Sequence, residues 1–253
     1  MWMARIWLAL GRAILYRKYM RPNRRPTASI DRRSQPAYAV AEAARYLGLP
    51  PATLRSWVLG RRYDTTSGSR RFTAVVQPAS RRPLLMSFWN LVECHVLRAL
   101  RTDHHVPLRE VRQALAFAEG QLAISNLLLR KDLLAGGGGL FLERYGQLIE
   151  LSASGQLAMR RVLEDHLQRV EWDATQFPIR LYPFVFGETA GGRRPIAIDP
   201  AVAFGRPIVV TRGVTTAILA ERVDAGESVA DLAADYDLTE TEIEQAILYE
   251  RAA

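Results

Sequence analysis

The sequence contains one cysteine, four histidines and no long apolar run, and each of these shortages excludes a class of protein. Cys94 cannot form a disulfide within the chain, and four scattered histidines do not supply the spaced ligands of a zinc site. The apolar run at residues 6–10 is far shorter than the roughly 18 residues that would cross a bilayer. The composition is otherwise that of an ordinary globular protein. We therefore expect a cytoplasmic protein that does not bind membranes.

Acidic residues are scarce in the first half of the chain. Residues 1–37 carry nine Arg or Lys against one Asp, net +8, and residues 38–115 carry twelve against five, net +7. Residues 116–190 carry seven against nine, net −2, and residues 191–253 carry six against eleven, net −5. A basic surface attracts a polyanion and an acidic one repels it. Nucleic acid is therefore an expected partner of the first half only.

Residues 1–37 are interpreted as a basic N-terminal arm. Arg5 and Arg12 lie seven residues apart, on one side of a helix, and a basic stretch follows them. We expect a disordered or surface-lying arm, or the product of a start codon assigned too far upstream. A signal peptide is the remaining alternative.

Two short helices joined by a tight turn are predicted in residues 38–59, YAVAEAARYLGLPPATLRSWVL. Gly48 can adopt the left-handed conformation that ends the first helix, and Pro50-Pro51 suits the start of the second. Ala44 is small enough to let the two helices approach closely. The pattern is typical of a DNA-reading helix-turn-helix.

The second of these helices carries the candidate base-reading residues. Its expected outward positions are Ala52, Thr53, Arg55, Ser56 and Val58. An arginine such as Arg55 can donate two hydrogen bonds to a guanine edge, and Thr53 and Ser56 can reach a phosphate or a base. The sequence therefore predicts that Thr53, Arg55 and Ser56 bind DNA.

Arginine pairs follow this helix on both sides of a Thr/Ser/Gly turn. Arg61 and Arg62 precede the turn, Arg70 and Arg71 follow it, and a β-prone run extends over residues 72–77. A strand-turn-strand beside a recognition helix is a wing, and its arginines would hold the flanking phosphates. The alternative is a helical hairpin with a solvated basic loop.

Helical spacing continues over residues 88–99 and again from Pro107, with the sequence LREVRQAL. Residues 38–118 as a whole resemble the winged helix-turn-helix of MerR-type regulators. The long C-terminal coiled coil and the metal-binding cysteines of the metal-responsive members are missing, so the resemblance does not imply a metal inducer. Cys94 is expected to be a buried core residue.

Residues 119–190 are predicted to be a middle α/β linker region. Gly136 to Gly139 are expected to form a flexible turn, because the Lys and Ser/Thr of a phosphate-binding loop do not follow them. A β-hairpin is expected over residues 140–151 and an amphipathic helix over residues 152–172. The Pro- and Gly-containing stretch from residue 177 to 200 is interpreted as a linker or domain edge.

Residues 191–253 are predicted to form a C-terminal domain with a strand pair, a helix and a second helix-turn-helix. Ser228 and Thr239 are expected helix caps, with Asp237 at the turn between them. Its second helix carries Glu240, Glu242 and Glu244, and carboxylates there would repel phosphate. This motif is therefore expected to contact protein.

A second resemblance lies in this C-terminal domain, which is similar to the domain of unknown function 433. The residues that carry it are Ile198, Asp199, Pro200, Gly205, Pro207, Val209, Thr211 and Arg212. One departure is Val210, where the family usually has glycine. The resemblance implies an antitoxin of a type II toxin-antitoxin pair, of the VapB type, whose partner is a PIN-like ribonuclease. Arg206 or Arg212 could then neutralise the carboxylates of the toxin.

These expectations combine into a mainly α protein with small β elements, an α+β fold. The predicted function is an antitoxin that neutralises its PIN-like ribonuclease toxin by direct binding, represses its own operon by binding operator DNA, and forms a homodimer. A stand-alone MerR-like regulator, whose last domain dimerises or senses a ligand, is the alternative. We expect no enzyme activity and no cofactor, because the sequence has no base, nucleophile or metal ligands at usable spacing.

Overall fold

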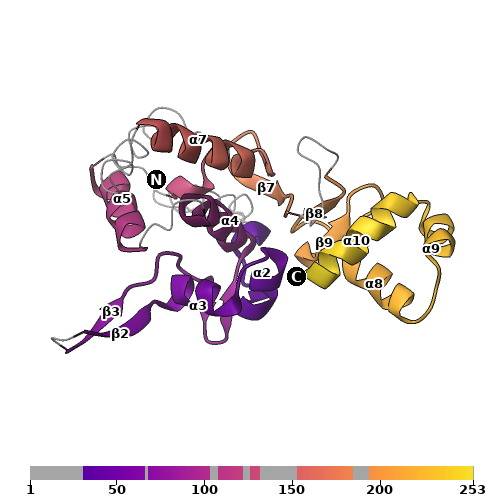
Figure 1. Ribbon diagram of the computed structural model, residues 1–253, viewed down its shortest axis with the longest axis horizontal. Helices are drawn as coiled ribbons and strands as arrows, with labels where there is room; N and C mark the ends of the chain where they lie inside the picture. Colours follow the sequence, from indigo (N-terminus) through magenta and orange to yellow (C-terminus); the bar gives the residue numbers. More distant parts are fainter. Residues whose placement is uncertain are drawn as a thin grey trace, which may run out of the picture. The chain divides into compact units, whose positions relative to one another are not determined.

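The computed structural model describes residues 31–65, 68–102, 108–121, 126–131, 153–184 and 194–252 (Figure 1). The chain divides into two units at Asp31/Arg32, and the elements described below belong to the second unit. The basic arm up to residue 30, His104-His105, the glycine quartet and the predicted hairpin at 140–151 lie outside the described residues. Within those residues, none of the helices has the length and apolar character needed to span a membrane.

The first helix-turn-helix is confirmed. Strand β1 (Tyr38–Ala39) leads into α2 (Val40–Tyr46), and α3 (Pro51–Leu59) follows after a short turn. Gly48 has φ +59°, the left-handed conformation that glycine adopts without a steric cost. The amide of Leu49 donates to the carbonyl of Ala44 at 2.9 Å, so one of the last carbonyls of α2 is satisfied within the turn.

The wing is an antiparallel hairpin of β2 (Arg61–Thr65) and β3 (Gly68–Phe72), which follows α3 directly (Figure 1). The strand predicted over residues 72–77 is wrong beyond Phe72. The amides of Val75 and Val76 instead donate to the carbonyl of Trp57, at 2.8 and 3.2 Å. A helix leaves its last carbonyls without partners, and this segment satisfies one of them while Val76 becomes buried.

The rest of the N-terminal part packs on α4 (Phe88–Thr102). A three-stranded sheet has the order β1-β5-β4, with β4 at Ser80–Arg81 and β5 at Leu84–Met86. Cys94 is fully buried on α4, as expected. The remaining elements of this part are η1 (Arg32–Ser34), α5 (Leu108–Gln121), η2 (Leu127–Leu129) and α7 (Ala153–Leu167).

A five-stranded antiparallel sheet joins the middle of the chain to its end, in the order β10-β9-β8-β7-β6. The strands are β6 (Val170–Trp172), β7 (Pro178–Leu181), β8 (Ile196–Ile198), β9 (Pro207–Val209) and β10 (Val214–Thr215).

Two predictions about this region need correction. The helix predicted to reach residue 172 ends at Leu167, and the stretch interpreted as a linker contains β7. Glu171 on β6 lies opposite Arg180 on β7, and an ion pair of 2.9 Å joins them across the strands. The sheet extends across the boundary placed between residues 190 and 191, because Leu181 pairs with Ile198.

The C-terminal helices are α8 (Thr216–Asp224), α9 (Val229–Tyr236) and α10 (Glu240–Ala252). Ser228 caps α9 by accepting the amide of Asp231 at 3.1 Å. Thr239 accepts the amide of Glu242 at 3.2 Å, and the Glu242 carboxylate accepts the amide of Thr239 at 2.9 Å. This reciprocal capping box confirms the predicted start of α10.

The two helix-turn-helix motifs share one turn geometry. Asp237 has φ +52° where Gly48 has +59°, and the Leu238 amide donates to the Ala233 carbonyl at 3.0 Å. The second motif packs in its own apolar cluster, which includes Leu232, Ile243 and Ile247. Helices dominate the described residues and the sheets are small, so the predicted α+β fold class is confirmed.

Candidate nucleic-acid interface and C-terminal surface

Helix α3 presents one exposed cation among the three predicted base-reading residues. Arg55 is exposed, whereas Thr53 and Ser56 are half-buried, and the Ser56 hydroxyl donates to the Thr53 carbonyl at 2.7 Å. Val58, expected to face outward, is fully buried beside Leu54 in the core. Positions four apart lie on the same helix face, so Val58 shares the core side with Leu54. Arg55 is therefore the side chain of this helix best placed to reach a base.

The wing register brings the predicted arginines together. Arg62 lies opposite Arg71, and Tyr63 lies opposite Arg70. Arg61 and Arg62 are exposed, while the side chains of Arg70 and Arg71 lie outside the described set. Like charges at opposed positions destabilise a hairpin, and a phosphate beside them would remove that repulsion. The register therefore suits an anion-binding wing.

The wing and the recognition helix are joined by a single residue. Gly60 ends α3 with φ +75°, its amide donates to the Ser56 carbonyl at 3.0 Å, and β2 begins at Arg61. Arg98 of α4 donates to the Leu47 carbonyl at 2.6 Å, which ties the end of α2 to the core. The one-residue connection at Gly60 fixes the orientation of α3 against the wing.

The N-terminal module and the C-terminal module are held together by polar contacts, one of them buried, that the sequence does not reveal. The Tyr249 hydroxyl of α10 donates to the Tyr46 carbonyl of α2 at 3.0 Å. Arg45 of α2 forms an ion pair with Glu250 of α10. Burial, and after it the neighbouring Glu250 carboxylate, raises the pKa of Tyr249 well above its usual value, so its hydroxyl stays protonated and donates.

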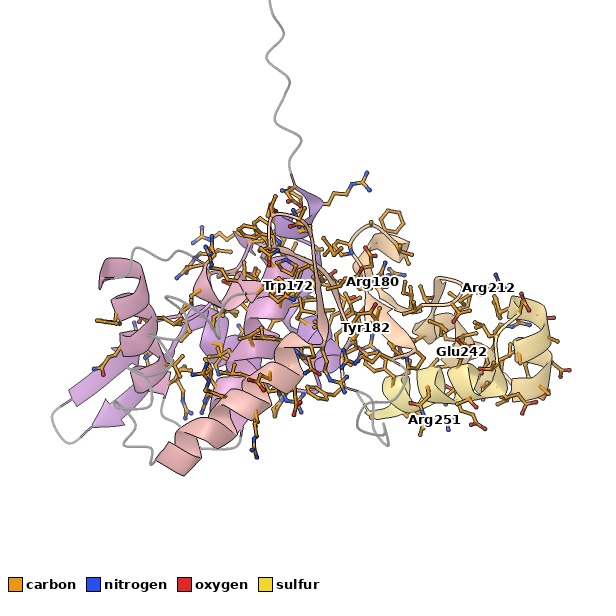
Figure 2. All side chains as sticks on the ribbon, turned by 90° about the horizontal axis from the view of Figure 1, so that it is seen from above. Trp172, Arg180, Tyr182, Arg212, Glu242 and Arg251 are labelled. Carbon is orange, nitrogen blue, oxygen red and sulfur yellow. The ribbon has the colours of Figure 1, made fainter. Side chains whose placement is uncertain are left out.

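The motif residue Asp199 is a structural anchor. It is 8% exposed and accepts two hydrogen bonds from the Arg180 guanidinium, at 2.8 and 3.1 Å, and one from the Ala201 amide at 2.8 Å. Arg180, labelled in Figure 2, also pairs with Glu171. Asp199 therefore ties β7 to the turn that follows β8.

The two arginines predicted to bind the toxin differ in their surroundings. Arg212, labelled in Figure 2, pairs with the Asp237 carboxylate and donates to the Asp237 carbonyl at 3.2 Å. Arg212 is therefore paired with an acid of its own domain. Arg206 is exposed and follows the turn η4 (Ala203–Gly205).

The glutamates at the start of α10 are not equivalent. Glu242 closes the capping box and also accepts a hydrogen bond from the Thr211 hydroxyl. Glu240 and Glu244 are exposed. The carboxylates of Glu240 and Glu244 thus remain on the surface of this helix, where they would repel phosphate.

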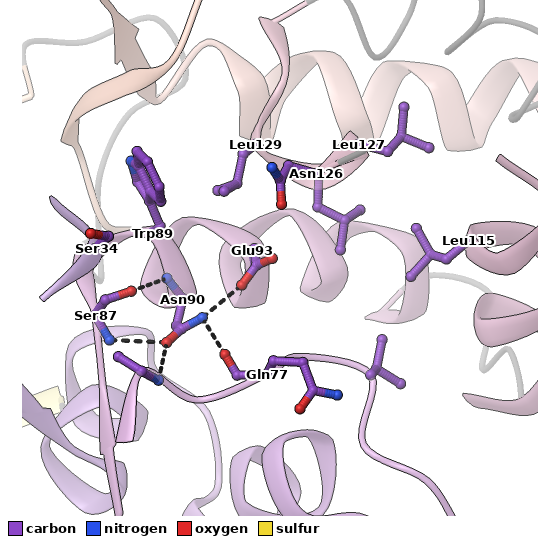
Figure 3. A pocket seen from close by; sticks show the side chains of 13 residues that line it. Ser34, Gln77, Ser87, Trp89, Asn90, Glu93, Leu115, Asn126, Leu127 and Leu129 are labelled. Carbon is purple, nitrogen blue, oxygen red and sulfur yellow. Dashed lines mark hydrogen bonds between the residues drawn. The ribbon is translucent and has the colours of Figure 1, made fainter. Parts of the chain in front are cut away.

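A cavity of about 310 Å³ lies beside α4 (Figure 3). Asn90 lines this cavity, and its side-chain amide forms hydrogen bonds within the protein. The side-chain oxygen accepts the amides of Ser87 and Ala79, at 3.0 and 3.1 Å, and the nitrogen donates to the Gln77 carbonyl at 2.9 Å. These contacts fix the segment after the wing to α4. In the part of the chain that the structure describes, no group of three His, Cys, Asp or Glu side chains could hold a metal ion.

Comparison with protein families finds matches to two parts of the chain. Residues 36–115 match the family described as "Putative DNA-binding HTH domain", and residues 196–249 match "Protein of unknown function (DUF433)". The helix-turn-helix and the resemblance to the domain of unknown function 433 are therefore confirmed.

Comparison with whole proteins finds relatives that span most of the chain. The protein named "Putative antitoxin VapB45" of Mycobacterium tuberculosis is 28% identical over 84% of this chain and 92% of its own length. "Uncharacterized protein Rv2308" of the same organism is 25% identical over 91% of this chain and 95% of its own. The crystal structure of Rv2018 from this organism has a TM-score of 0.60 at 22% identity, covering 84% of this chain and 97% of that one. The solved structure supports the fold, and the first relative supports a VapB-type resemblance.

Proposed function

We propose that this protein is the antitoxin of a type II toxin-antitoxin pair. Its winged helix-turn-helix binds the operator of its own gene pair, and its C-terminal domain binds the toxin. Similarity to the relative named "Putative antitoxin VapB45" over most of both chains supports the class. The protein acts in the cytoplasm as a homodimer, without catalysis of its own.

The DNA-binding part of this proposal rests on Arg55, which is exposed on α3. A short connection joins α3 to a wing in which arginines lie opposite each other. Residues 38–115 carry net +7, whereas residues 191–253 carry net −5. Counter-ion release from DNA favours contact with the first of these surfaces and disfavours the second. The N-terminal motif therefore faces the operator.

A binding assay on the operator tests this assignment. Arg55→Ala should cost roughly 1–3 kcal/mol on the operator and relax its sequence preference, because a base contact is lost. Arg71→Ala should weaken binding to all sequences alike and lower the salt dependence by about one unit of slope. Arg251→Ala removes an exposed cation of α10 and is the matched control, which should bind as wild type. Unchanged binding by both Arg55→Ala and Arg71→Ala would exclude the winged helix as the DNA-binding element.

The toxin in this proposal is a PIN-like ribonuclease, which uses clustered carboxylates with Mg²⁺. Arg206 is the better placed of the two candidate arginines, since Arg212 is already paired with Asp237. Co-purification with the product of the adjacent gene tests the partnership. Arg206→Ala should weaken rescue of toxin-expressing cells more than Arg212→Ala does.

Point variants are preferable to truncation in this test. Deletion of residues 195–253 would remove β8, β9 and β10 from a sheet that also contains β6 and β7. The exposed edge of β7 would then destabilise the remaining chain.

A stand-alone MerR-like regulator is the second candidate function. The buried bond from Tyr249 to Tyr46 favours it, because a C-terminal domain fixed to α2 can act on the helix-turn-helix without any toxin. A gene for a small nuclease beside this one supports the antitoxin, and a neighbourhood without one supports the plain regulator.

A further inference from the structure

Phe204 is the most exposed large apolar side chain that the structure describes, with 94% of its surface accessible. It occupies the middle of η4, where Ala203, Phe204 and Gly205 have φ of +46°, +56° and +77°. This left-handed conformation is costly for alanine and phenylalanine. Such strained residues persist where the surrounding structure imposes them, and they cluster at functional sites.

The turn that carries Phe204 is firmly held. The Gly205 amide donates to the Val202 carbonyl at 2.9 Å, and the Arg206 amide donates to the Ala203 carbonyl at 3.1 Å. The Gly205 carbonyl accepts the buried Tyr38 hydroxyl at 3.1 Å. A rigid turn thus presents an aromatic ring to the outside, with the exposed Arg206 two residues further on.

A pocket with an apolar wall lies at the β6 edge of the same sheet. It has a volume of about 480 Å³ and is formed by α7, Lys131 and β6. Its apolar wall comes from Leu167, Val170 and Trp172, and Trp172, labelled in Figure 2, lies opposite Pro178 of β7. The exposed Glu164 lies at its rim. The pocket is large enough to hold a phenyl ring.

The turn and the pocket are connected through the sheet. Glu171, which lines the pocket, pairs with Arg180, and Arg180 pairs with Asp199 just before the turn. Two surfaces on one small sheet can meet their counterparts in a second copy across a single twofold axis.

We propose that Phe204 of one protomer inserts into the pocket at Leu167, Val170 and Trp172 of a second copy, and that Arg206 pairs there with Glu164. Glu164 is the partner because Glu171 is already bonded to Arg180 and Tyr182. This inference rests on the homodimer of the proposed function and identifies its contact surface. It implies that the toxin and the second copy compete for Arg206. The acidic C-terminal domain disfavours nucleic acid as the occupant, and the complementary pocket on the chain itself favours a second copy.

Sedimentation equilibrium of the full-length protein over a range of concentrations tests the contact. The wild type should be a dimer, and Phe204→Ala should raise the dissociation constant at least tenfold. Ile218→Ala is the matched control, because Ile218 is an exposed apolar side chain of α8 outside the turn and the pocket. It should dimerise as wild type.

Charge reversal tests the pairing separately. Arg206→Glu and Glu164→Arg should each weaken the dimer severalfold, and the double variant should recover most of the loss. Both side chains are exposed, so neither change disturbs the core.

A wild-type monomer at all concentrations would overturn both the homodimer and this contact. A dimer that is unaffected by Phe204→Ala would overturn the contact alone. If Phe204→Ala still dimerises but no longer co-purifies with the nuclease, the proposed dimer contact is also wrong. The turn that carries Phe204 would then be a toxin-binding surface. Operator binding, measured on the same proteins, reports on the DNA-binding function independently.

Discussion

The hydroxyl of Tyr38, the first residue of the winged helix-turn-helix, lies directly against Gly205, a motif residue of the C-terminal domain. It donates to the Gly205 carbonyl at 3.1 Å, and a Cβ placed on Gly205 would lie 2.1 Å from the hydroxyl oxygen. Glycine is therefore required at this position for two reasons, its φ of +77° and the proximity of Tyr38. The winged helix-turn-helix and the C-terminal domain are therefore in direct contact at this point.

Gly205→Ala should destabilise the fold by about 2 kcal/mol or more, since backbone strain and a steric clash act together. Gly226→Ala is the control, because Gly226 has φ +99° but no heavy atom within 4 Å of its added Cβ. It should cost about 1 kcal/mol, from backbone strain alone. Urea denaturation measures both, and equal losses would show that the Tyr38 contact is unimportant.

Tyr249→Phe should destabilise the protein by about 1–3 kcal/mol, because the buried Tyr46 carbonyl loses its donor. The change keeps the aromatic ring and therefore the packing. Urea denaturation and hydrogen exchange of α2 measure the effect. A variant as stable as wild type, with unchanged exchange in α2, would contradict a stabilising role for this contact.

His95 should make the fold sensitive to mild acid. Its Nε2 bonds the His166 carbonyl at 3.0 Å, and burial, followed by the neighbouring His166, Arg169 and Arg98, lowers its pKa well below 6.5. Below pH 6.5 the unfolded chain binds a proton that the folded chain does not, so stability falls as the pH drops. The expected loss approaches about 1.4 kcal/mol per pH unit.

His95→Gln provides the comparison for this pH dependence. Glutamine can still donate to the His166 carbonyl but does not titrate. Denaturation curves at pH 7 and pH 5.5 should show a smaller loss of stability for the variant than for the wild type. Equal losses would assign the acid sensitivity to other groups.

Phe204→Gly should stabilise the isolated protomer by about 1 kcal/mol, because glycine adopts φ +56° without steric cost. Phe204→Ala keeps the Cβ and therefore the strain, so its stability should match that of the wild type. Thermal unfolding at a concentration low enough to dissociate the dimer measures the difference. A Phe204→Gly variant no more stable than Phe204→Ala would mean that the turn stores no strain.

Local signals in the sequence were sufficient for both helix-turn-helix motifs. Gly48, Ser228 and Asp237 adopt the turn or cap geometry that their side chains favour, because these features depend on residues close in the chain. The prediction failed at residues 170–172, which continue an apolar pattern but form β6. Only the distant partner strand β7 distinguishes a strand from a helix end there.

The sequence by itself determined the two motifs and the basic and acidic halves, because composition and short-range spacing specify them. The tertiary structure alone decided how these parts join. The contacts of Tyr38 with Gly205, Tyr46 with Tyr249 and Arg180 with Asp199 link residues 167, 203 and 19 positions apart. Such pairs leave no periodic signal in a single sequence, because their proximity arises only when the whole chain has folded.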